Sequence, residues 1–117
     1  MNQNDLKKRT KQFALRILKL TAALPRSPEA IVLRNQLVRS GTSVGANYRA
    51  VCRSRSTAEF ISKLGVVIEE ADESCFWMEL MIESGMLSKE KTSDLLSEAN
   101  EITAIMTAAR KTAQDRV

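Results

Sequence analysis

Apolar side chains recur every three or four residues along almost the whole chain, and this spacing constrains the fold more than any other feature. Four segments show it, at about residues 5–24, 28–53, 56–84 and 88–113. Because an α-helix turns once in 3.6 residues, the spacing places the apolar side chains of each segment on one face. No segment shows the alternation of a half-buried strand. The sequence therefore predicts an all-α protein.

Short breaks separate the segments, and they contain residues that begin or end helices. Serine and aspartate cap helix starts, proline favours a first helical position, and glycine ends a helix in a left-handed conformation. The residues of these kinds are Asp5, Pro25, Ser27, Pro28, Ser56 with Glu59 at capping-box spacing, Gly85 and Ser88. Links this short force neighbouring helices to run antiparallel. We therefore expect one domain, residues 1–117, folded as an antiparallel up-down-up-down four-helix bundle.

One glycine falls within the apolar face of the second segment. A glycine inside a helix costs about 1 kcal/mol relative to alanine. Gly41 is thus expected to mark a close approach between two helices.

The residue types argue against catalysis and against a bound metal. The chain has no histidine, and its two cysteines, Cys52 and Cys75, form no Cys-x-x-Cys pair. Zinc sites and di-metal bundles draw on such ligands. Both cysteines adjoin apolar faces and are expected in the core, and the acidic run at 69–73 is interpreted as a solvated face. We expect a non-enzymatic protein with no cofactor and no metal.

The same features bear on the compartment. No window of about 18 uncharged apolar residues occurs, so no membrane-spanning helix is expected. Residues 1–11 are polar and basic, and no apolar signal region follows them. With two unpaired thiols, the chain is predicted to be cytoplasmic, without a membrane partner.

Charge is divided unequally along the chain. Residues 1–63 carry a net charge of +10, and residues 64–117 carry −6. This asymmetry indicates either an anionic partner for the first half or a contact between halves of different copies.

The basic residues of the first two helices form a candidate binding surface, because guanidinium and ammonium groups neutralise phosphates. Aromatic residues make up 4% of the chain and none lies among these cations, so we expect contact with RNA or DNA backbone rather than base stacking. The candidate nucleic-acid-binding residues are Lys7, Lys11, Arg34, Arg39, Arg49 and Arg53. A solvated basic surface without a ligand is the alternative.

The third segment is apolar on nearly all sides, which indicates more burial than one bundle provides. Aromatic residues and methionine are typical of interface cores. The candidate oligomer-interface residues are Ile61, Phe76, Trp77 and Leu80. Opposite charge in the two halves suits a head-to-tail contact that closes into a ring. The alternative is that these side chains cover a loop or a chain end.

Several motifs resemble those of a known family. They are residues 36–49 (QLVRSGTSVGANYR), 60–64 (FISKL), 69–74 (EEADES), 77–80 (WMEL), 83–85 (ESG) and the stretch 95–105. The chain resembles the bacterial four-helix-bundle proteins, also called 23S ribosomal RNA intervening-sequence proteins, over about residues 10–112. The resemblance implies a bundle that assembles as a ring-shaped homopentamer. It also implies that some members are encoded inside insertions in ribosomal RNA genes, and that relatives are accessory proteins of diversity-generating retroelements, where a basic surface engages nucleic acid and a reverse transcriptase.

The family motif draws attention to Asn47, Tyr48 and Arg49. Tyr48 falls on the apolar face, so its ring should be buried and its hydroxyl should need a partner. We expect a structural network in which Glu70 or Glu73 pairs with Arg49. Members often carry an acidic residue after the Tyr-Arg pair, where this chain has Ala50.

Two functions remain open at this level. The first is a non-enzymatic homo-oligomer, by resemblance a homopentamer, that binds nucleic-acid backbone through the basic surface of the first two helices. The second is a protein-interaction scaffold that binds no nucleic acid.

Overall fold

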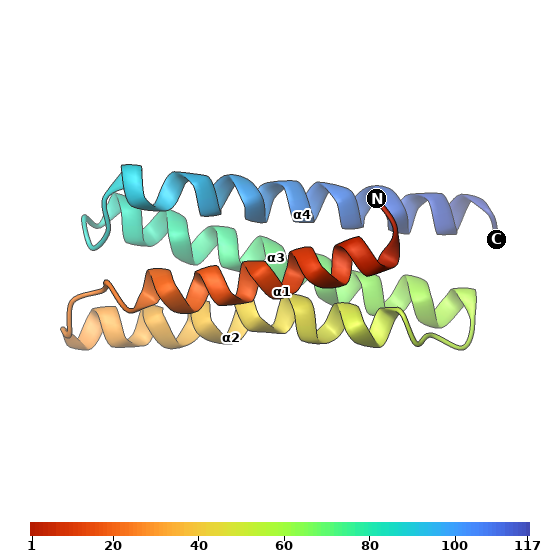
Figure 1. Ribbon diagram of the computed structural model, residues 1–117, viewed down its shortest axis with the longest axis horizontal. Coiled ribbons are helices and arrows are strands. Elements are labelled where there is room, and N and C mark those ends of the chain that lie inside the picture. The colour runs from red at the N-terminus through yellow and green to blue at the C-terminus, as the bar shows by residue number, and fades with distance from the viewer.

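The computed structural model describes residues 1–117 and contains four α-helices and no strand. The helices are α1 (Gln3–Thr21), α2 (Pro28–Val51), α3 (Thr57–Glu83) and α4 (Lys89–Asp115). Successive helices run in opposite directions along a rod of 47 × 20 × 20 Å, so both termini lie at the same end (Figure 1). The predicted antiparallel four-helix bundle is confirmed.

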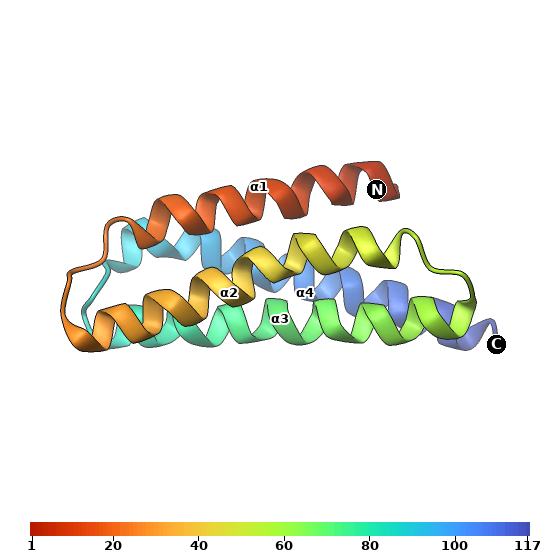
Figure 2. The ribbon, with the colours of Figure 1, turned by 90° about the horizontal axis from the view of Figure 1, so that it is seen from below.

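The helices surround one shared core. Each helix packs against two neighbours, α1 against α2 and α4, and α3 against the same two, so that α1 and α3 are diagonal (Figure 2). The core cluster contains 19 buried residues and draws on all four helices. Its largest fully buried members include Phe13, Leu37, Met78 and Ile102, one from each helix. These residues occupy the apolar faces that the three-and-four spacing predicts.

The helix starts follow the capping chemistry of the sequence, with two corrections. The side chains of Ser27, Ser56 and Ser88 accept hydrogen bonds from the backbone N–H three residues on, as predicted. Asp5 is not the cap of α1: Asn2 caps it, and Asp5 is the third helical residue of a reciprocal capping box, so α1 begins earlier than expected. At α3 the capping box is only half formed, because the Glu59 carboxylate accepts instead from Lys63 Nζ at 2.7 Å.

The expected end of α3 is confirmed, whereas α2 ends earlier than expected. Gly85 adopts a left-handed conformation, with φ of 79°, directly after α3. Leu87 then packs back into the core, where it is 6% exposed. Helix α2 ends at Val51 rather than near Arg53, which places Arg53 in the α2–α3 connection.

Helices α1 and α2 approach each other closely where α2 carries glycine. A Cβ atom on Gly41 would lie 2.7 Å from Ile17 Cγ1, and one on Gly45 would lie 3.2 Å from the Thr10 carbonyl oxygen. Real Cβ atoms essentially never make the first contact, so only glycine allows Ile17 to pack there. The close approach expected at Gly41 is confirmed.

Candidate nucleic-acid interface

Four cationic side chains converge on a groove between α1 and α2. Lys7, Lys8 and Lys11 come from α1 and Arg49 comes from α2. We call the groove, together with all its lining residues, the basic groove; these are Lys7, Lys8, Lys11, Ala14, Thr42, Gly45, Ala46 and Arg49. Its volume is about 500 Å³.

Local helix geometry explains how the groove forms. Lys7 and Lys11 are four residues apart, so they are neighbours on one face of α1. The other lining residues, Ala14, Thr42, Gly45 and Ala46, have short side chains or none, and Gly45 lets the backbone of α1 come close to α2. The groove thus combines small residues with long cationic side chains, so an anion that enters it meets no bulky apolar group.

The cations of the basic groove have no partners within the chain. The ion pairs of the structure involve Arg9, Arg39 and Lys63 and none of the groove residues. No carboxylate lines the groove. Like charges held this close repel one another, and a bound anion would relieve that repulsion.

The structure separates the predicted basic residues into three groups. Lys7, Lys11 and Arg49 lie together in the basic groove. Arg34 and Arg53 are exposed and unpaired, but they lie outside it. Lys8 also lines the groove, although it is not among the predicted binding residues. Its position beside Lys7 in one basic run is the sequence signal that could have indicated it.

Arg39 alone forms the third group, because ion pairs with Glu70 and Glu73 already neutralise its charge. Its guanidinium donates to Glu70 Oε2 at 3.0 Å and also to a carboxylate oxygen of Glu73. The Gln36 amide oxygen accepts a further bond from it at 3.4 Å. Arg39 is therefore part of an intramolecular cluster and not of the candidate interface.

The expected pairing of Arg49 with Glu70 or Glu73 is wrong, because both carboxylates pair with Arg39. The reason is register. The buried Ser74 hydroxyl donates to the Ser40 hydroxyl at 3.0 Å, which sets residue 40 of α2 opposite residue 74 of α3. In antiparallel helices residue 39 then lies opposite about residue 75, and residue 49 opposite about residue 65. Glu73 is therefore much nearer the level of Arg39 than that of Arg49, and Glu70, about midway between the two levels, pairs with Arg39 as well.

The other members of the predicted network stay within α2. The Asn47 amide donates to the Ser43 carbonyl at 2.8 Å. Tyr48 is in the core and 3% exposed, as expected. Burial, with the nearby Cys52 thiol, raises the pKa of the Tyr48 hydroxyl above its ordinary value.

The candidate interface residues on α3 form two separate sites. The Phe76 and Trp77 rings meet edge to face, with centroids 5.1 Å apart, and Phe76 remains 52% exposed. The Trp77 indole N–H donates to Glu73 at 3.2 Å, and Leu80 lies one turn beyond Phe76. Ile61 is partly buried and lies 15 residues earlier, about 22 Å along the helix axis, so it does not extend this patch.

The remaining reactive groups are placed for packing. Cys75 is 4% exposed, and burial raises the pKa of its thiol to about 11, so the thiol is protonated near neutral pH. No three His, Cys, Asp or Glu side chains converge as a metal site would require. None of the four helices combines the length and apolar character needed to cross a bilayer.

The fold defines the class of this protein, a small antiparallel four-helix bundle. The family model described as 23S rRNA-intervening sequence protein matches residues 2–108. The chain therefore belongs to the 23S rRNA-intervening sequence protein family.

A solved structure supports the same assignment. It is described as a protein of unknown function from the S23 ribosomal protein family of Bacteroides thetaiotaomicron, and it shares 33% sequence identity with this chain. The two superpose with a TM-score of 0.86 over 95% of this chain and 99% of the other. No curated protein matches the sequence.

Proposed function

We propose that this protein is a non-enzymatic homo-oligomer that binds RNA or DNA backbone through the basic groove. The observation that carries the proposal is the convergence of four unpaired cations on a channel without a carboxylate. The names of the matching family and of the solved relative refer to ribosomal RNA and to a ribosomal protein. A cytoplasmic site of action follows from this proposal.

The groove favours phosphates over bases. It contains no aromatic residue on which a base would stack. Lysine and arginine side chains contact phosphates without reading sequence, so the expected binding has little sequence preference and depends strongly on salt.

The proposed assembly is a homopentamer, as the family resemblance implies. Phe76, Trp77 and Leu80 supply its apolar contact, and the charge difference between the two halves of the chain favours a head-to-tail arrangement. A ring of this kind would repeat the basic groove around its circumference and raise the avidity for a long polyanion.

Titration of a single-stranded RNA at several salt concentrations tests the nucleic-acid proposal. In the triple variant Lys7→Ala, Lys11→Ala and Arg49→Ala we expect an affinity loss of about tenfold or more at low salt. The slope of log affinity against log salt should become shallower by about two to three units.

A matched control removes the same charge elsewhere. Arg34, Lys89 and Lys111 are exposed, unpaired and outside the groove, and their combined alanine variant should bind nearly as well as the wild type. Equal losses in both triple variants, or no RNA binding by the wild type at low salt, would refute the proposed groove.

Light scattering tests the assembly. The wild type is expected at about five times the chain mass of 13.0 kDa. Phe76→Asp should lower that mass while helix content by circular dichroism is unchanged. A monomeric wild type would rule out the ring, whereas an oligomer that binds no RNA would favour the scaffold function, which the exposed Phe76 also supports.

A further inference from the structure

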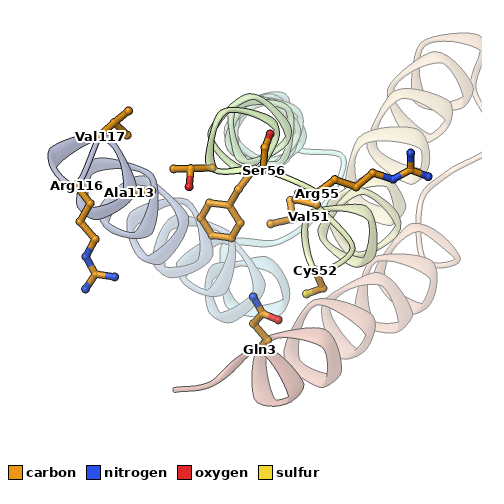
Figure 3. Close-up of a pocket in the computed structure, with 11 residues that line it drawn as sticks. Gln3, Val51, Cys52, Arg55, Ser56, Ala113, Arg116 and Val117 are labelled. Carbon is orange, nitrogen blue, oxygen red and sulfur yellow. The ribbon is translucent and has the colours of Figure 1, made fainter.

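A second cavity opens at the end of the bundle where both termini lie (Figure 3). Its volume is about 620 Å³, within the range of about 300–1,000 Å³ typical of small-molecule sites. We call it the end cavity; its lining residues are Gln3, Val51, Cys52, Ser54, Arg55, Ser56, Thr57, Phe60, Ala113, Arg116 and Val117. It shares no residue with the basic groove.

The end cavity contains a polar atom without a partner. Ser54 Oγ is buried and makes no hydrogen bond, and no other buried side-chain nitrogen or oxygen in the chain lacks one. A buried hydroxyl left unpaired costs free energy, and such groups in folded proteins call for an explanation. Ser54 is a lining residue of the end cavity, and a polar group of a ligand would supply the missing partner once the atoms that cover this hydroxyl move aside.

The charge around the end cavity favours an anion. Arg55 and Arg116 stand at its rim without ion pairs, and no carboxylate side chain lines it. Figure 3 shows both arginines extended outward from the cavity. Both are exposed, so each is free to change its side-chain conformation without breaking an ion pair. Glu59 is not a lining residue, and it pairs with Lys63.

The backbone adds no net preference for an anion. The first turns of α1 and α3 reach this end of the rod, but so do the last turns of α2 and α4, and residues of all four line the cavity. The positive ends of two helix dipoles therefore lie beside the negative ends of two others.

The inner wall is apolar and includes an aromatic ring. Val51 is 1% exposed, and Phe60 and Ala113 are partly buried beside it. A ligand that fits must therefore combine a flat apolar body with an anionic head.

We propose that the end cavity binds a small aromatic phosphate ester of about the size of a mononucleotide. The ring packs on Phe60, the phosphate lies toward Arg55 and Arg116, and a hydroxyl of the ligand pairs with Ser54. A free nucleotide and the phosphorylated end of an RNA strand share this chemistry. The site does not depend on the basic groove.

Titration of the full chain with adenosine 5′-monophosphate, followed by amide NMR shifts, tests the proposal. We expect saturable shifts at Gln3 and at residues 51–60, with low-millimolar affinity or better. Adenosine and ribose 5-phosphate, which each lack one half of the ligand, should bind several-fold more weakly. Shifts confined to the basic groove, or no saturable shift with the monophosphate, would overturn it.

Two variants sharpen the test. Arg55→Ala should weaken binding several-fold, whereas Arg53→Ala, two residues away and outside the cavity, should leave it unchanged. Ser54→Ala should also weaken binding, yet the ligand-free variant should melt no lower than the wild type, because it removes an unpaired hydroxyl. Equal losses for Arg53→Ala and Arg55→Ala would overturn the site.

A second comparison identifies the source of the ligand. A short RNA with a 5′-phosphate should shift the same amides more than its 5′-hydroxyl counterpart if strand ends occupy the cavity. Equal shifts from the two RNAs would assign the cavity to free nucleotides, provided that the monophosphate still binds.

Discussion

Helix α1 is held against its two neighbours in different ways. Toward α2 the contact depends on shape, because Gly41 and Gly45 admit Ile17 and the backbone at Thr10. Toward α4 the contact includes charge: the Arg9 guanidinium donates to both carboxylate oxygens of Glu98, at 2.8 and 2.7 Å.

The difference decides which cations are available to a partner. On the α2 side, packing needs no charge, so the lysines of α1 and Arg49 stay unpaired above the contact. On the α4 side, Arg9 is neutralised by Glu98 and, at 3.5 Å, by Glu101. Around α1, cations are therefore unpaired on the side where small residues close the helix contact and paired on the side where an ion pair contributes to it.

The largest effect is expected from a substitution that disrupts the tight contact between α1 and α2. Gly41→Val places branched carbon where Ile17 packs, and we expect a loss of about 3 kcal/mol in the free energy of unfolding, measured by urea denaturation. Gly65→Ala is the control. Its Cβ would meet the nearest atom, Arg110 Nη2, at an ordinary 3.6 Å, so a gain of about 0.5–1 kcal/mol is expected from helix propensity. If Gly41→Val left the free energy of unfolding unchanged, that result would contradict the tight contact between α1 and α2.

The next largest effect is expected from a substitution that removes the ion pair between α1 and α4. Arg9→Met leaves the partly buried Glu98 carboxylate unpaired, and we expect a loss of about 1–2 kcal/mol in the same measurement. Lys63→Met removes the more exposed pair with Glu59 and should cost clearly less. Equal losses would mean that Arg9 and Glu98 behave as an ordinary surface pair.

A third, smaller effect compares two arginines of α2. Arg49→Ala should weaken RNA binding several-fold, about 1 kcal/mol, and make the salt slope shallower by about one unit. Arg39→Ala should change RNA binding little but lower stability, because it leaves Glu70 and Glu73 side by side without their shared cation. The comparison fails if Arg39→Ala weakens RNA binding as much as Arg49→Ala.

The smallest effect is a dependence of stability on pH. The hydrogen bond from Arg9 lowers the pKa of Glu98 below its ordinary value of 4.5. Its stabilisation is therefore complete above that value and is lost as the pH falls through the lowered pKa. When the free energy of unfolding is measured by urea titration at a series of pH values, Glu98→Gln should reduce its fall at acid pH. Glu83→Gln, at an exposed and unpaired position, should not. If the fall in the free energy of unfolding at acid pH were the same in Glu98→Gln as in the wild type, Arg9 would not stabilise the ionised Glu98 carboxylate.

Much of the fold follows from local chemistry that a sequence displays. Apolar spacing predicts which faces are buried, and the serine caps and Gly85 predict where helices start and stop. Even the close approach at Gly41 is predictable, because glycine on an apolar face has few other uses. The cap of α1 was misassigned to Asp5 because Asn2 and Asp5 form a reciprocal pair, and both residue types favour that position.

The sequence by itself thus determined the helices, the serine caps of three of them, the antiparallel order and the uneven division of charge, since each depends on residues close together in the chain. Only the tertiary structure decided which cations are free and which are paired. That outcome depends on the register of α2 against α3, set by contacts such as that between Ser40 and Ser74, and on how closely α1 approaches α2. A shift of one helical turn moves a side chain about 5.4 Å, enough to exchange one salt-bridge partner for another, and no local pattern specifies it.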